Sequence, residues 1–519
     1  MKNVSLTLFV VGLLMLASCN GGGNTSTLII EPSNASTTAS GKSITLTARG
    51  ASEVSWSLSP ELGSLSATSG TSVTYKPPER VESAHTVTVT ATSGNLSTSA
   101  SITVEPLIIN VAGTVLSIGG SPISGALVAV AGKYPVATDA NGRFEIYNVI
   151  APYTIIIQNN VLNYYVYNNL IKNNPVLYSH IYGPKYTASI NIEIDNTTNN
   201  NLLGLELLSN NAIISEIVNA TSGTTSHTLN AYLFSGSAAG NLYALEWTED
   251  ANGNVVEYTG YAKTKSPFAI LNGQAVNIPR ITLSPVSTRS ISVVIDTPTK
   301  TIRNTFAAGI RFSKDGYAWP LIVKRETNPG ASLNVLSPNL ENAFLQATAL
   351  AEIPVSNSLT TKTNKQATSQ AVSEVYGYVW DSVPVADDNL KLKFPPRPEL
   401  LEPVENASID PSTVFKWSGN DNNINIVYFD GPVTITYFTN NHFAKLPDLS
   451  AFGITYKSGN SFLWNVKQLH LGSLCNNLNQ YTSYKIIQPD LLYLSIINFK
   501  PVSYRGYWLH SRTGRFTIR

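Results

Sequence analysis

The chain of 519 residues is poor in charge and in cysteine. Asp, Glu, Lys and Arg make up 13% of it, and its net charge is +1, whereas charged residues usually reach about 25%. There is no long basic run, which argues against nucleic acid as a partner. The two cysteines, Cys19 and Cys475, are too few for a disulfide framework, so stability must come from apolar cores. We expect Cys475 to be a small buried apolar residue.

Catalytic and metal-binding motifs are also missing. There is no G-x-S-x-G elbow, no P-loop and no G-x-G-x-x-G, and no two histidines have the spacing of metal ligands. We therefore predict no catalytic site, no cofactor and no metal site. A glycosidase needs only two carboxylates, which spacing does not reveal, so a hydrolase remains an alternative. The six histidines are scattered, at His85, His180, His227, His442, His470 and His510.

Long helical patterns are nearly absent, whereas Tyr, Val, Ile and Thr are frequent. Short segments alternate apolar and polar residues, which is typical of strands with one buried face. The composition and spacing predict an all-β chain of about five tandem β-sandwich domains.

The amino end carries a short apolar run, from Val4 to Leu16. About 13 residues match a signal-peptide core and fall short of the ~20 that a spanning helix needs. The run ends in Leu16, Ala17, Ser18 and Cys19, followed by the Gly-rich tether 19–26. This stretch resembles the lipobox of bacterial lipoproteins. An ordinary secretory peptide cleaved near Ala17 is the alternative.

The lipobox resemblance implies cleavage after residue 18 and fatty acylation of Cys19, which would tether the protein to a membrane. Asn20 follows the cysteine, and by family analogy this favours the outer membrane or cell surface.

Residues 27–105 alternate as a small sandwich, with Val54, Trp56 and Leu58 on one face of a strand. The stretches Val73–Pro78 and Thr86–Thr92 resemble those of bacterial immunoglobulin-like domains. We expect Trp56 to be a core residue, since it is in phase with its apolar neighbours. A sugar platform is the alternative.

Residues 107–160 contain the most specific internal pattern. Pro122-Ile123-Ser124-Gly125-Ala126 precedes Thr138-Asp139-Ala140-Asn141-Gly142-Arg143-Phe144. The pattern resembles the carboxypeptidase regulatory-like (transthyretin-like) domain, which implies a sandwich module without peptidase activity. Asn141-Gly142 is expected to form a positive-φ turn, and Phe144, Ile146 and Val149 are expected to face the core.

Residues 161–187 have no regular alternation and are expected to form a loop and strand over the neighbouring module. Their Tyr and Asn residues could instead stack a sugar. The candidates for ligand stacking are Tyr164, Tyr165, Tyr167 and Trp319.

Residues 187–287 and 288–396 are expected to be two β-sandwich units. Leu203–Leu207 matches Ala308–Phe312, and Leu242–Trp247 matches Phe344–Ala349. A duplication and a chance likeness of alternating strands are both open. Ser356–Ser373 is expected to be a mobile loop. Asp250, Asn252 and Asn254 do not fit an EF-hand loop, and a turn at Asn252-Gly253 is the simpler interpretation.

Residues 398–519 open with Pro398-Glu399-Leu400-Leu401-Glu402-Pro403, followed by Phe415-Lys416-Trp417. This opening resembles bacterial fibronectin type III-like domains, and implies that Trp417 is a core residue.

These features predict a non-catalytic, lipid-anchored envelope protein that acts as an adhesion or scaffold rod. The expected partners are the membrane, through Cys19, and envelope glycans or proteins. A carbohydrate-binding lipoprotein is the first alternative, and a hydrolase with a hidden active site is the second.

Overall fold

The computed structural model describes most of the chain from residue 27 onward. The described residues are 27–117, 121–160, 162–179, 186–196, 201–209, 212–213, 215–221, 223–233, 236–251, 254–298, 301–311, 318–327, 332–354, 373–421, 423–472, 475, 477–482 and 506–519. The expected signal peptide, lipobox and tether lie outside them, as does the expected loop up to residue 372.

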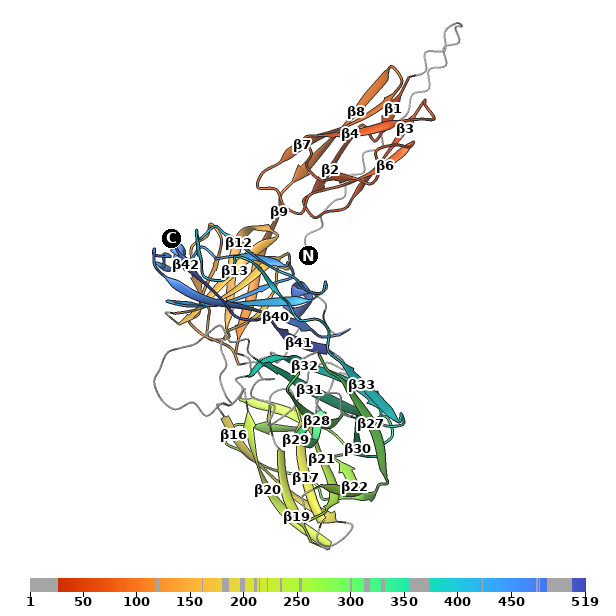
Figure 1. Cartoon of the computed structure of the whole chain (residues 1–519), viewed down its shortest axis with the longest axis vertical. Helices are drawn as coiled ribbons and strands as arrows, with labels where there is room; N and C mark the ends of the chain where they lie inside the picture. The colour runs from red at the N-terminus through yellow and green to blue at the C-terminus, as the bar shows by residue number, and fades with distance from the viewer. Residues whose placement is uncertain are drawn as a thin grey trace, which may run out of the picture. The chain divides into compact units, whose positions relative to one another are not determined.

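The described residues form strands almost throughout, which confirms the predicted all-β class. The chain divides into two compact units, Met1–Leu107 and Ile108–Arg519 (Figure 1). None of the helices formed by the described residues has the length and apolar character that a membrane crossing requires.

The first unit is a β-sandwich. One sheet has the order β1 (Ile29–Glu31), β3 (Ile44–Arg49), β6 (Ser72–Lys76), β5 (Ser64–Leu65); the other has the order β2 (Asn34–Thr38), β8 (Leu96–Glu105), β7 (His85–Ser93), β4 (Ser55–Ser59).

Trp56 packs between these two sheets with 4% of its surface exposed. Its Nε1 donates a 2.7 Å hydrogen bond to the Gly70 carbonyl. The expected core role of Trp56 is confirmed, and no face of the indole is free for a sugar.

The second unit contains four sandwiches, here named A to D in sequence order. In A, one sheet has the order β12 (Arg143–Ala151), β9 (Leu107–Leu116), β15 (Val176–Tyr178); the other has the order β11 (Val136–Ala137), β10 (Leu127–Val130), β13 (Tyr153–Asn160), β14 (Asn163–Leu170).

The turn before β12 follows the sequence expectation in part. Gly142 has a positive φ of 71°, and Asp139 Oδ1 accepts hydrogen bonds from the amides of Asn141 and Arg143. Asn141 itself does not have a positive φ, because the side chain of Asp139 closes the turn. The expected core residues Phe144, Ile146 and Val149 are buried.

Sandwich B pairs β18 (Ala212–Ile213), β20 (Gly223–Leu233), β16 (Tyr186–Asn196), β24 (Ala275–Asn277) and β25 (Ile281–Thr282) in one sheet. Its other sheet contains β19 (Ser215–Ala220), β17 (Asn201–Leu208), β21 (Ser237–Glu249), β22 (Val255–Lys263), β26 (Ser284–Pro285) and β23 (Phe268–Leu271).

Sandwich C pairs β30 (Ser332–Pro338), β27 (Thr288–Asp296) and β33 (Asn389–Lys393) in one sheet, and β29 (Ala318–Thr327), β28 (Arg303–Arg311), β31 (Phe344–Pro354) and β32 (Ser373–Pro384) in the other.

Sandwiches B and C share their strand pairing. In B, β16 lies between antiparallel β20 and parallel β24; in C, β27 lies between antiparallel β30 and parallel β33. The orders β19-β17-β21-β22 and β29-β28-β31-β32 also correspond. The segments matched in sequence fall on equivalent strands, which is what a duplication would produce. The duplication itself stays a prediction.

Sandwich D has a small sheet of β34 (Leu400–Glu402), β36 (Val414–Trp417) and β39 (Phe443–Lys445). Its larger sheet contains β38 (Thr434–Thr439), β37 (Ile424–Asp430), β40 (Ser461–His470), β41 (Gly506–His510), β42 (Gly514–Ile518) and β35 (Ala407–Ile409). The short helices are η1 (Ser450–Phe452) and α1 (Leu478–Tyr481). Trp417 is 2% exposed in the core, as expected.

One 14-stranded sheet runs through three of the sandwiches. β14 of A pairs in parallel with β38 of D, and β41 of D pairs antiparallel with β32 of C. In Figure 1 the blue strands of D therefore lie beside the orange strands of A. B contacts C through a separate cluster that includes Trp247, Tyr258 and Ile310. The order of contact is thus A, D, C, B, although the order in sequence is A, B, C, D.

Candidate functional site: the groove between sandwiches A and D

Two of the expected ligand-stacking residues are buried. Tyr164 and Tyr167 have 0% of their surface exposed, so the alternative in which these two residues stack a sugar is wrong. They lie on β14, within the stretch for which a loop and strand was expected. Both faces of β14 are covered: Tyr164 packs in the core cluster of D, and Tyr167 on the other face stacks on Phe438. Tyr165 is half-buried. Trp319 belongs to β29, and its side chain lies outside the described residues.

Tyr167 instead joins the two sandwiches. Its hydroxyl donates to the Tyr178 carbonyl at 2.8 Å and accepts from the Tyr178 amide at 2.9 Å. Its ring stacks on Phe438 of β38 with centroids 4.5 Å apart. The ring centroids of Phe438 and Tyr178 each lie 6.3 Å from the ring centroid of Tyr481 in α1. These aromatic contacts bury the junction between A and D.

The helix α1 ties the same junction by hydrogen bonds. Asn479 Oδ1 accepts from the Ile171 amide at 2.9 Å, and the Thr482 carbonyl accepts from the Val176 amide at 2.7 Å. The helix begins at Asn477, whose Oδ1 accepts from the Gln480 amide at 2.9 Å, a typical N-cap. Asn479 and Thr482, which lie late in the sequence, thus accept hydrogen bonds from backbone amides of A.

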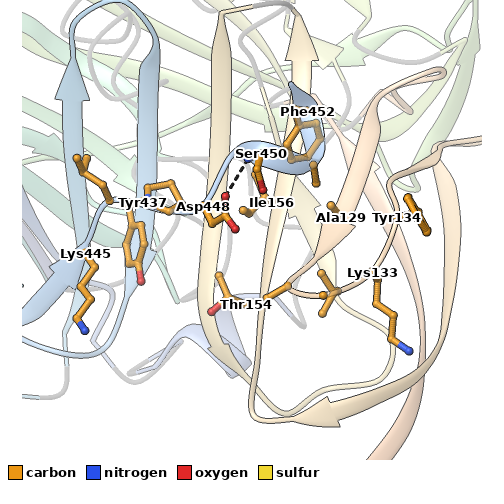
Figure 2. A pocket seen from close by; sticks show the side chains of 16 residues that line it. Ala129, Lys133, Tyr134, Thr154, Ile156, Tyr437, Lys445, Asp448, Ser450 and Phe452 are labelled. Carbon is orange, nitrogen blue, oxygen red and sulfur yellow. Dashed lines mark hydrogen bonds between the residues drawn. The ribbon is translucent and has the colours of Figure 1, made fainter. Parts of the chain in front are cut away.

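On the other face of this junction is a groove of about 690 Å³ (Figure 2). Ala129 of β10 and Ile156 and Thr154 of β13 line it from A. From D it is lined by residues between Lys445, at the end of β39, and Phe452 of η1. Its volume is within the ~300–1,000 Å³ range of small-ligand sites. Figure 2 shows side chains from both sandwiches converging on it.

Local turns place the groove's rim residues. In A, the Lys133 amide donates to the Val130 carbonyl at 2.9 Å. Gly132 has a φ of 78° in this turn, which a residue with a side chain rarely adopts. The turn leaves the neighbouring Tyr134 ring 94% exposed.

In D, Gly453 ends η1 with a φ of 75° and donates to the Ser450 carbonyl at 2.9 Å. The Tyr456 hydroxyl donates to the Pro447 carbonyl at 2.8 Å. Both walls are therefore held by hydrogen bonds.

The groove contains two lysines and a single carboxylate, Asp448. Lys133 and Lys445 are both exposed. Asp448 Oδ1 accepts from the Ser450 amide at 2.9 Å, and this bond, with one from the Ser450 side chain, lowers the pKa of the carboxyl. Asp448 is therefore ionised at neutral pH, and the lining has a net positive charge.

Tyr437 of β38 supplies a hydroxyl, on a largely buried side chain, to this groove. The residue is 6% exposed, and burial raises its pKa well above the usual range, so the hydroxyl is protonated at neutral pH. In Figure 2 it points into the space between Lys445 and Thr154. Among the described residues, none forms a hydrogen bond with it. A hydroxyl without a protein partner is suited to bind a polar ligand.

A second polar cluster lies where D meets C. Arg397 Nη1 lies 3.0 Å from Glu374 Oε1, and Lys467 Nζ lies 5.0 Å above the Trp508 ring. Burial, aided by the positive charges of Lys467 and Arg397, lowers the pKa of His510 to about 3. His510 is thus neutral at physiological pH, and this cluster lies where β40 and β41 of D meet β32 of C in the shared sheet.

Cys475 and Asp250, which the sequence analysis also singled out, do not line the groove. Cys475 is 2% exposed, as expected, and its thiol donates to the Asn477 carbonyl at 3.1 Å. Burial raises the pKa of this thiol to about 11, so it is not nucleophilic at neutral pH.

Asp250 Oδ1 accepts from the Asn254 amide at 2.8 Å. The expected turn residues between them, Asn252 and Gly253, lie outside the described part of the chain. Within that part, no three His, Cys, Asp or Glu residues form a group that could hold a metal ion.

Sequence reasoning missed the groove because its walls come from segments about 300 residues apart. The detectable local signal was the polar, aromatic turn Gly132-Lys133-Tyr134-Pro135. No local signal in the sequence pairs it with Lys445 and Asp448.

No protein family matches this chain, and no curated protein matches it. Among solved structures, it is similar to the Bacillus anthracis TIE protein, with 12% identity over 72% of this chain and 75% of that chain and a TM-score of 0.23. It is also similar to BcpA, the major pilin subunit of Bacillus cereus, with 9% identity over 56% and 99% of the two chains and a TM-score of 0.13.

A further likeness is to the four N-terminal immunoglobulin domains of Dscam1 isoform 7.44, with 9% identity over 95% and 99% of the chains and a TM-score of 0.13. Likenesses this distant carry no information about function.

Proposed function

We propose that this protein is a lipid-anchored, non-catalytic component of a bacterial cell envelope that acts in adhesion or as a scaffold. The observation that carries the proposal is the sheet shared by A, D and C. Backbone hydrogen bonds across β14–β38 and β32–β41 hold three sandwiches in fixed register. Such a body presents binding surfaces at set positions, which suits attachment and scaffolding.

The anchoring part rests on the amino end. The apolar run, Leu16-Ala17-Ser18-Cys19 and the Gly-rich tether together support lipidation of Cys19. Several acyl chains hold a protein on a membrane stably where one chain is marginal. By the same resemblance the outer membrane or the cell surface is the destination.

The module assignments support an exported β-protein. The two sheets of A and the Gly142 turn support a carboxypeptidase regulatory-like module. The buried Trp417 on β36 supports a fibronectin type III-like opening of D. The strand β41, which D shares with C, is an addition to that pattern.

The hydrolase alternative finds little support in the groove. Glycoside hydrolysis generally uses a pair of carboxyl groups, one on each side of the bond to be cleaved. Asp448 is the single carboxylate in the groove's lining. The groove therefore favours binding over hydrolysis.

Membrane fractionation of cells that express the full chain tests the proposal. The native protein should be found with membranes, and Cys19→Ser should release it into the soluble fraction. Cys475→Ala is the matched control: its buried thiol is replaced by a small apolar group, and it should stay with membranes. Equal membrane retention of Cys19→Ser and the native protein would refute the anchor.

The adhesion part is tested with intact cells. Cells that carry the native protein should attach to glycan- or protein-coated surfaces more strongly than cells that carry Cys19→Ser. Identical attachment to every coating by both kinds of cell would contradict a role in adhesion.

A further inference from the structure

We propose that the groove between A and D binds an acidic oligosaccharide through Lys133, Tyr134, Tyr437, Lys445 and Asp448. The inference deepens the proposed adhesion function and rests on its binding part. It does not depend on lipidation of Cys19.

The charge of the groove selects an anionic ligand. Lys133 and Lys445 form no ion pair with any residue that the structure describes, and both line the groove from opposite sandwiches. Asp448 is engaged by Ser450. Two lysines in the lining of one groove attract a carboxylate or a comparable anion from solution.

The hydroxyl of Tyr437 favours a ligand that is also rich in hydroxyl groups. Its side chain is 6% exposed, and among described residues its hydroxyl has no hydrogen-bond partner. A sugar hydroxyl can both donate to it and accept from it. The oxygens of Asp448 can accept from a second sugar hydroxyl.

Tyr134 provides a surface for the apolar face of a sugar ring. It is 94% exposed, the highest value among the exposed large apolar residues of the described chain. It is located on the turn that forms the groove's rim, beside Lys133. An exposed aromatic ring next to polar groups suits an amphipathic ligand. The apolar face of the ligand can pack on the ring while its polar edges form hydrogen bonds with the neighbouring groups.

The topology disfavours an extended peptide as the ligand. The groove's floor is made by β10 and β13, which are paired on both sides: β10 with β11 and β13, and β13 with β10 and β14. A peptide that binds by strand addition needs an open sheet edge, and this floor offers none.

Binding is tested with the full chain carrying Cys19→Ser, purified from the soluble fraction. The probes are an array of oligosaccharides that contain uronic acids, each paired with its neutral methyl ester, and a decamer of glutamate. We expect binding to at least one acidic oligosaccharide at least tenfold tighter than to its methyl ester. The affinity should fall as the salt concentration rises, because salt screens the attraction between the lysines and the anionic ligand.

Three variants, one of them double, assign the binding to the groove. Lys133→Gln with Lys445→Gln should weaken it about tenfold or more, since each exposed charge pair contributes up to about fivefold. Tyr437→Phe should weaken it about threefold to tenfold, as one hydrogen bond does. Tyr134→Ala should weaken it severalfold.

The matched controls are lysines and a tyrosine that are exposed elsewhere. Lys263→Gln with Lys393→Gln, in B and C, and Tyr147→Ala, on β12, should leave affinity unchanged. Thermal melting of each variant confirms that it is folded.

The proposal is overturned if no acidic oligosaccharide binds more tightly than its methyl ester, if the groove variants bind like the controls, or if only the glutamate decamer binds. None of these outcomes depends on whether Cys19→Ser releases the protein from membranes. Failure of the binding proposal and failure of the membrane anchor can therefore be distinguished.

Discussion

Val166 of β14 is the parallel partner of Tyr437 of β38, although two complete sandwiches separate them in the sequence. The pairing puts Val166 and Tyr437 into one apolar cluster with Trp417 and Trp464. It also positions the Tyr437 hydroxyl at the groove. Strand pairing between A and D therefore makes both the shared sheet and the candidate site.

Tyr167→Phe should weaken the A–D junction. The change removes the hydroxyl that bonds both the carbonyl and the amide of Tyr178. We expect the free energy of unfolding to fall by about 1–3 kcal/mol, since a buried amide is left without its partner. Urea denaturation measures this. Tyr147→Phe, at an exposed tyrosine of the same sandwich, should change stability by less than about 0.5 kcal/mol.

Gly377→Ala should disturb the junction between D and C. An added Cβ would lie 2.6 Å from the Trp508 carbonyl oxygen and 3.0 Å from Leu509 Cα. Because both neighbours are backbone of the paired strand β41, relief requires the strands to move apart, at a cost of about 1–3 kcal/mol. Limited proteolysis should cleave the variant faster near β41.

The control for that change is Gly236→Ala, where an added Cβ meets nothing within 4 Å. Equal proteolysis of Gly377→Ala and Gly236→Ala would show that β32 and β41 are not in close register.

His510 should make stability depend on pH. Its pKa is about 3 in the folded protein and about 6.5 when unfolded. Between these values the unfolded chain binds a proton that the folded chain does not, so the free energy of unfolding falls as the pH is lowered from 6.5 towards 3. The contribution is complete above pH ~6.5.

The variant His510→Gln does not titrate and isolates this effect. Relative to it, the native protein should lose up to about 1.4 kcal/mol per pH unit across that window. The comparison uses urea denaturation at pH 7, 6, 5 and 4, because carboxylates elsewhere titrate equally in both proteins. Parallel pH profiles would mean that His510 is solvated when folded.

The fold class was predictable because most strands alternate. Trp56 and Phe144 are in phase with apolar neighbours, so both strands and their buried faces could be assigned from the sequence. Gly142 could be placed in a turn because few residues adopt a positive φ.

A strand was expected within residues 161–187, but the pairing of β14 with D was not predictable in the same way. Asn163–Leu170 has no clean alternation, because Tyr164 and Val166 face the core of D while Tyr167 faces Phe438 on the opposite side. A strand that is buried on both faces loses the period-two pattern. Without β14, neither the A–D junction nor the groove could be inferred from sequence.

The central claim, that A and D share a sheet, is tested most directly by a disulfide across β14 and β38. Asn163 and Thr434 are register partners in these strands, and neighbouring strands lie about 4.8 Å apart, within the range that a disulfide spans. The pair Asn163→Cys and Thr434→Cys is introduced together with Cys19→Ser and Cys475→Ala, so that no other thiol remains.

The control pair is Asn163→Cys with Ser461→Cys, because β40 is separated from β14 by β38 and β37. Under mild oxidation, non-reducing electrophoresis should show an intramolecular disulfide for Asn163 with Thr434 and none for the control. Failure of the first pair to cross-link, or equal cross-linking of both, would contradict the shared sheet and the groove built on it.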